Sequence, residues 1–77
     1  MLTKRDWYLK QIKSGLPMQV KLTNGRGFVI LSVSGTMDNA ICQTKNEYES
    51  AAYAIEQNFN EFWDRIISLI PHYSKGR

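Results

Sequence analysis

The sequence is poor in the residues that build metal centres and catalytic sites. Its 77 residues include a single cysteine, Cys42, and a single histidine, His72. One residue of each type is too few for a metal site, and only His72 could activate a nucleophile. A single cysteine also excludes an intrachain disulfide, so Cys42 is predicted to be a small buried residue in a strand. These absences favour a non-enzymatic protein without a cofactor.

Long apolar runs are missing as well. The longest aliphatic and aromatic stretch, residues 28–31, is far too short for a membrane span or a signal core. There is no low-complexity segment and no internal repeat, and 43% of the residues are hydrophobic, which is typical of folded chains. We therefore expect residues 1–77 to form one soluble domain in the cytoplasm.

What the sequence has instead is charge sorted along its length. Residues 1–30 carry a net charge of +5, and residues 38–64 carry −5. The basic set is Lys4, Arg5, Lys10, Lys13, Lys21 and Arg26, and the acidic set is Asp38, Glu47, Glu49, Glu56, Glu61 and Asp64. Sorted charge without a catalytic constellation favours a protein that docks onto a partner.

The first half of the chain carries local signals for a helix and a β-meander. Thr3, with Asp6 three residues later, predicts the N-cap of a helix over about 4–14, which Gly15 ends in a left-handed conformation. Asn24-Gly25, between the alternating segment 19–23 and the apolar segment 28–33, predicts a hairpin. Because segment 28–33 is apolar on both faces, it is the predicted central strand. A third short strand is expected over 40–43.

From Asn46 the apolar spacing changes to that of a helix. Spacings of four and three alternate through Tyr48, Ala52, Ile55, Phe59, Phe62, Ile66 and Leu69, and Pro71 follows. This predicts a C-terminal helix about 36 Å long, with a second stripe of Trp63, Ile67 and Ile70. Either the helix breaks near Asn58 to Asn60, or its Phe59 to Ile70 end contacts another chain, as in a homodimer. The predicted fold class is α+β: a helix, a three-stranded antiparallel meander and a long C-terminal helix.

This order of elements resembles the double-stranded-RNA-binding domain. The segment 28–35, Thr44-Lys45 and the pair Ala51-Ala52 match its second strand, its second-helix start and its alanine pair. The resemblance implies binding to duplex RNA. Two features depart from that family: Asn46-Glu47-Tyr48-Glu49 stands where it has basic residues, and its long loop is shortened to Asn24-Gly25-Arg26-Gly27.

The chain also resembles small anti-CRISPR inhibitor proteins of phages. Segments 9–13, 20–22, 29–33 and 54–63 follow the same sequence of elements. In those inhibitors, acidic residues occupy the DNA-reading groove of the CRISPR effector, and the resemblance makes Asp38-Asn39, with Glu61 or Asp64, the counterparts. The family is strongly acidic, whereas this chain has a net charge of +3.

Two hypotheses follow. The leading one is a phage-type, non-enzymatic inhibitor of a host nucleic-acid-handling complex. The expected target is a CRISPR effector, and the inhibitor would act in the host cytoplasm as an anti-CRISPR protein. The acidic set, with Asn39, would block a basic groove as a nucleic-acid mimic, and Trp63 and Ile67 would anchor the contact or a homodimer. The alternative is a small nucleic-acid-binding module that uses the basic set.

Overall fold

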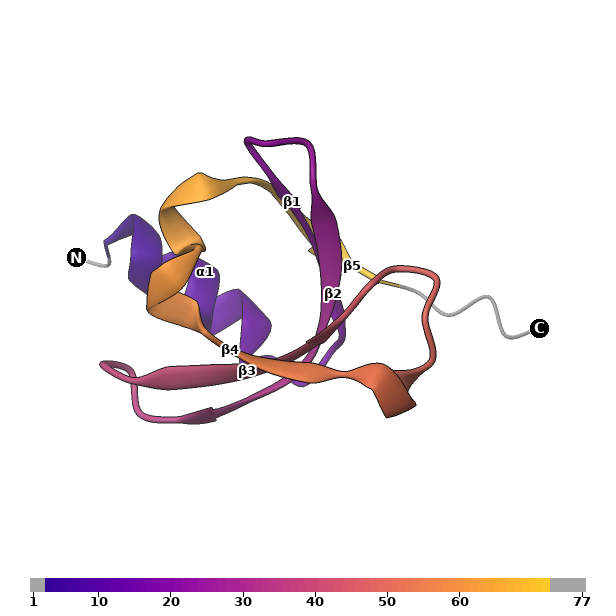
Figure 1. Cartoon of the computed structure of the whole chain (residues 1–77). Coiled ribbons are helices and arrows are strands. Elements are labelled where there is room, and N and C mark those ends of the chain that lie inside the picture. The colour runs from indigo at the N-terminus through magenta and orange to yellow at the C-terminus, as the bar shows by residue number, and fades with distance from the viewer. Residues whose placement is uncertain (1–2, 73–77) are drawn as a thin grey trace.

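Five antiparallel strands form one sheet in the computed structural model, which describes residues 3–72 (Figure 1). The main elements are α1 (Lys4–Ile12), β1 (Met18–Leu22), β2 (Gly27–Gly35), β3 (Ala40–Lys45), β4 (Ile55–Asn58) and β5 (Ile66–Pro71). Three short 3-10 turns join the later strands: η1 (Ala51–Tyr53), η2 (Phe59–Glu61) and η3 (Trp63–Arg65). The strand order is β4-β3-β2-β1-β5, so β2 is central and β4 and β5 are the edges.

The local signals of the first half correspond to real elements. The Thr3 side chain accepts a hydrogen bond from the Asp6 amide and caps α1, which ends at Ile12. The β1–β2 hairpin turns at Asn24-Gly25. Of these two residues, Gly25 has a positive φ, of 87°, and Asn24 does not. The Gly25 amide donates to the Leu22 carbonyl, which is typical of a type I turn followed by a left-handed glycine. The prediction that β2 is the central strand is confirmed.

The predicted long C-terminal helix is wrong, and with it the α+β class with a three-stranded meander. The protein is mostly β, with one short N-terminal helix and a five-stranded sheet. The meander exists as β1–β3, but β4 and β5 extend it on both sides. The segment that matched an anti-CRISPR helix, residues 54–63, forms β4, η2 and the start of η3.

Hydrogen bonds from backbone amides to nearby side chains favour turns over a helix in this segment. The Ser50 hydroxyl accepts from the Ala52 amide, and the Asn58 side chain accepts from the Asn60 amide. Such local bonds satisfy backbone donors in turns and compete with a continuous helix. The three-residue spacing of Phe59 and Phe62 also fits successive 3-10 turns, which bury both rings. Apolar spacing alone therefore did not distinguish turns and strands from a helix.

The core lies between the inner face of the sheet, α1 and the turns that lead to β5. Alternate residues of β1 and β3 are buried, and α1 contributes Leu9 and Ile12. The Phe62 ring packs edge-on against Phe28 and Phe59, with ring centroids 5.0 and 5.4 Å apart. Figure 1 shows α1 on the same side of the curved sheet as the segment between β4 and β5. The edge-on aromatic contacts thereby join the sheet to that segment.

Arg5 fixes α1 to two loops. Its guanidinium donates to the Asn60 side chain at 2.7 Å and to the Met37 carbonyl at 2.6 Å. It also lies 5.5 Å from the centre of the Phe59 ring and pairs with Asp6 at 3.5 Å. Arg5 is therefore a structural residue that ties the helix to η2 and to the β2–β3 turn.

We predict that Gly35→Ala destabilises the protein far more than Gly25→Ala. Both glycines have φ of 87°, so either alanine is strained by about 1–3 kcal/mol. At Gly35 a Cβ would also overlap the Asn39 carbonyl oxygen, whereas at Gly25 it would meet open space. Urea unfolding of both variants measures the difference, and equal losses would show that the β2–β3 turn relaxes without cost.

Candidate functional site

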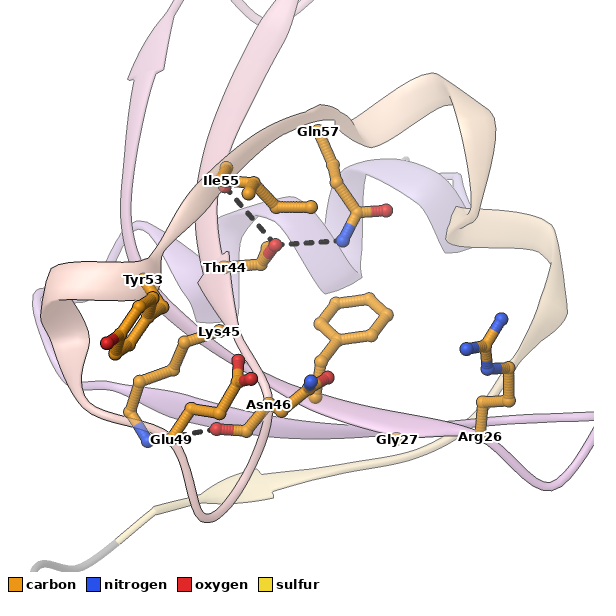
Figure 2. A pocket seen from close by; sticks show the side chains of 10 residues that line it. Arg26, Gly27, Thr44, Lys45, Asn46, Glu49, Tyr53, Ile55 and Gln57 are labelled. Carbon is orange, nitrogen blue, oxygen red and sulfur yellow. Dashed lines mark hydrogen bonds between the residues drawn. The ribbon is translucent and has the colours of Figure 1, made fainter.

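A pocket of about 410 Å³ opens where β2, β3 and β4 meet the loop after β3 (Figure 2). It lies at the start of β2 and the end of β3, next to the hairpin turn. Its lining combines cations, amides, a carboxylate, a hydroxyl and aromatic rings: Arg26, Gly27, Phe28, Thr44, Lys45, Asn46, Glu49, Tyr53, Ile55 and Gln57. Such a mixed lining can hold a ligand with both flat and polar parts.

The wall formed by β3 and β4 holds an oriented amide. Thr44 is buried, and its hydroxyl donates to the Ile55 carbonyl at 3.3 Å. The hydroxyl proton is thereby used, so Thr44 Oγ1 accepts from Gln57 Nε2 at 2.8 Å. Figure 2 shows the amide oxygen of Gln57 turned away from Thr44. Gln57 therefore presents a fixed acceptor, with its second N–H as a neighbouring donor.

The two cations of the pocket differ in their freedom. Lys45 Nζ donates to the carbonyls of Asn46 and Glu47, both at 3.2 Å, so this ammonium stabilises the loop after β3. Among residues 3–72, the Arg26 guanidinium has no hydrogen-bond or ion-pair partner. Arg26 is exposed on the hairpin turn, where its backbone amide donates to the Asn24 side chain. Its five N–H donors are available to an anionic ligand.

Aromatic and aliphatic groups provide the flat surfaces. Phe28 is buried, whereas Tyr53 in η1 is 70% exposed. Tyr53 is held by η1, where its amide donates to the Ser50 carbonyl. Ile55, on edge strand β4, is also exposed. Figure 2 shows Tyr53 and Arg26 at opposite sides of the pocket. A ligand that reaches both must therefore span the pocket, with a planar polar ring against Tyr53 and an anionic group toward Arg26.

The basic set does not form one face. Lys4 lies 5.7 Å from the centre of the Tyr8 ring, and Arg5 is engaged as described above. Lys10 on α1 and Lys13 at its C-cap are exposed. Lys21 and Arg26 belong to the hairpin instead. Figure 1 shows α1 apart from the β1–β2 turn. Of the basic set, only Arg26 reaches the pocket.

The acidic set is also divided, because no second helix exists. Glu47 and Glu49 lie in the loop after β3, Glu56 on β4, Glu61 in η2 and Asp64 in η3. Asp38-Asn39 lies at the opposite end of β3, where two hydrogen bonds join it to the start of η2. The Asn60 side chain donates to the Asp38 carbonyl at 3.0 Å, and that of Asn58 to the Asn39 side chain at 2.8 Å. The turn that holds Asp38 and Asn39 therefore adjoins η2, which contains Glu61.

The predicted anchors behave differently from one another. Trp63 is partly buried and packs against the core, whereas Ile67 and Ile70 on β5 are exposed. The first part of the predicted contact stripe is not a surface, since Phe59, Phe62 and Ile66 are buried. What remains exposed of the stripe lies along the outer strand β5.

Sequence reasoning missed most of the pocket. Arg26 and Glu49 were candidates, but Thr44, Tyr53 and Gln57 were not. Their meeting depends on the register of β3 with β4, in which Thr44 pairs with Ile55 and Cys42 with Gln57. One signal was present: Thr44 follows Ala40 and Cys42 at alternate positions, so its hydroxyl belongs to the inner face.

Metal chemistry has no geometric support in the described part of the chain. Residues 3–72 contain no group of three or more metal-ligating side chains, and no helix within them is long and apolar enough to cross a membrane. Comparison with protein-family models, with curated proteins and with solved structures finds no match to this chain.

Cys42 is predicted to be unreactive in the folded protein. It is a free, buried thiol on β3, and burial raises its pKa to about 11 from an ordinary 9.0. At pH 8 the thiolate fraction is then about one in a thousand, so iodoacetamide should label Cys42 only after unfolding in urea. Because the folded state holds this proton more tightly, stability should fall as pH rises from about 9 to 11. Rapid labelling of the folded protein would show that the strand opens readily.

Proposed function

We propose that this protein is a small, non-enzymatic module that binds single-stranded nucleic acid at the pocket between β2, β3 and β4. The observation that supports the proposal is the combination of an exposed Tyr53 ring, a free Arg26 guanidinium and an oriented Gln57 amide around one hollow. Proteins that bind single strands pair aromatic stacking with cationic contacts to the backbone. The net charge of +3 agrees with an anionic ligand.

Each group has a distinct part in this proposal. Tyr53 stacks on a base, because any base has a flat face for an aromatic ring. The Gln57 amide offers an adjacent acceptor and donor, the pattern with which side-chain amides read the edge of a base. Arg26 binds a phosphate of the same strand, across the pocket from that base.

Tyr53→Ala is expected to weaken binding of a labelled single-stranded oligonucleotide. Loss of one stacked base costs about 1–3 kcal/mol, which corresponds to an affinity about 5- to 150-fold lower. Fluorescence anisotropy at fixed salt measures the change with RNA and DNA strands. Tyr48→Ala is the matched control, since Tyr48 is exposed in the same loop but does not line the pocket.

Arg26→Ala should weaken binding in the same assay and lower its salt dependence, because one phosphate contact is lost. Lys13→Ala, at the C-cap of α1, should have a smaller effect. If Tyr53→Ala and Arg26→Ala bind as the wild type does, the pocket is not the site. If Lys10→Glu with Lys13→Glu alone abolishes binding, the site lies on α1 instead.

A second candidate function is the phage-type inhibitor, for which a CRISPR effector is the expected target. The observation that favours it is the position of Asp38-Asn39 beside η2, which contains Glu61. These are residues that the anti-CRISPR resemblance singles out. A small acidic surface of this kind could engage a basic groove of the effector.

For this candidate, Asp38→Lys with Glu61→Lys should abolish capture of a protein partner from a bacterial lysate treated with nuclease. Like charges would then face the basic groove, and juxtaposed like charges cost several kcal/mol. Glu47→Lys, at the other end of β3, is the control and should leave capture unchanged. Quantitative mass spectrometry of the captured proteins measures both. Equal capture by all variants would remove the acidic surface from the mechanism.

A further inference from the structure

The exposed large apolar side chains of the sheet lie only on its two edges. Among the strand residues of 3–72, these are Ile55 on β4, which is 62% exposed, and Ile67 and Ile70 on β5, which are 63% and 51% exposed. The three inner strands have none. A partner strand at either edge would remove part of this apolar surface from water.

The β5 edge lacks the features that usually prevent strand pairing. Natural edge strands carry lysines or other charges, whereas β5, Ile66–Pro71, has no charged residue. The His72 amide donates to the Pro17 carbonyl, and this sets the alternation of the β1–β5 ladder. By that alternation the N–H and C=O of Leu69 point away from β1, toward the open side. Only Pro71, at the end of the strand, limits pairing there.

We propose that the β5 edge of one copy of this protein pairs with the β4 edge of a second copy. Lys45 on β3, beside β4, is held by two loop carbonyls, and the other strand charges beside the two edges are opposite in sign. Glu56 lies on β4, after the loop that carries Glu47 and Glu49, whereas Lys21 on β1 lies opposite Ser68 of β5. Pairing β4 with β5 brings opposite charges near each other, while pairing like edges brings like charges together.

This contact joins different surfaces of the two copies. Each copy therefore keeps one unpaired edge, so a third copy can bind in the same way, and the assembly closes only if the rotation between copies allows a ring. The incoming β5 lies beside Ile55 and Gln57, which line the pocket on β4. The second copy would thus supply an outer wall to the pocket. The pairing itself goes beyond the proposed function and is tested without nucleic acid.

The first test is the mass of the nuclease-treated protein by size-exclusion chromatography with light scattering, over a range of concentrations. We expect a mass that is a multiple of 8.9 kDa and exceeds two copies at the higher concentrations. A single-copy mass throughout would overturn the proposal.

Edge-specific variants test which surfaces meet. Ile55→Lys blocks the β4 edge, and Ile67→Lys with Ile70→Lys blocks the β5 edge, so each protein alone should fall to one copy. Mixed in equal amounts, the two proteins should form a one-to-one dimer, because each retains the edge that the other lacks. A dimer of Ile55→Lys alone would instead show that like edges pair, and it would overturn the β4–β5 contact.

Leu16→Lys is the control, because Leu16 is 53% exposed between α1 and β1, away from both edges. It should keep the wild-type mass. A loss of assembly in this variant would mean that any added positive charge prevents assembly, whether or not it blocks an edge. Circular dichroism checks the fold of each variant. If a lysine variant loses the wild-type spectrum, Ile67→Ser with Ile70→Ser replaces it, with the same expected loss of assembly.

Discussion

The short connection between β4 and β5 constrains the whole sheet. These strands are the two edges, so in a flat sheet four strand spacings, about 19 Å, would separate them. Residues 59–65, which join them, consist mainly of 3-10 turns, and at about 2 Å per residue they extend only about 14 Å. The sheet must therefore curve until its edges approach one another. Phe59 and Phe62, carried by that connection, fill the inside of the curve.

The two ends of the protein differ in how their polar side chains are used. At the end that holds α1, Arg5 and the side chains of Asn58 and Asn60 connect the helix, the β2–β3 turn and η2. The Arg5, Asn58 and Asn60 side chains are thus used within the fold. At the other end, the described part of the chain places no helix between the hairpin turn and the loop after β3, and it gives the Arg26 guanidinium no partner. The pocket lies at this end and is lined by residues of both segments.

Sequence reasoning succeeded where the signals were local. The Thr3 cap, the Asn24-Gly25 turn and the central position of β2 depend on neighbouring residues or on one strand, and all three are present. It failed after Asn46, because spacings of three and four fit buried 3-10 turns and strands as well as one helix face. Of the pocket residues, Arg26 and Glu49 were found through their charge. Tyr53 and Gln57 were missed because they reach the pocket only through the pairing of β3 with β4, which no short-range pattern indicates.

Strand β4 connects the proposed binding site to the proposed contact between copies. Its inward side chains, Ile55 and Gln57, line the pocket, while its outer backbone edge is where a second copy would pair. A ligand that contacts both the pocket and the incoming β5 would then bind the assembled form more tightly than a single copy. By linkage, the same free energy would favour assembly when the ligand is bound. Strand β4 would thus couple binding to self-association, because it is both a wall of the pocket and an open edge of the sheet.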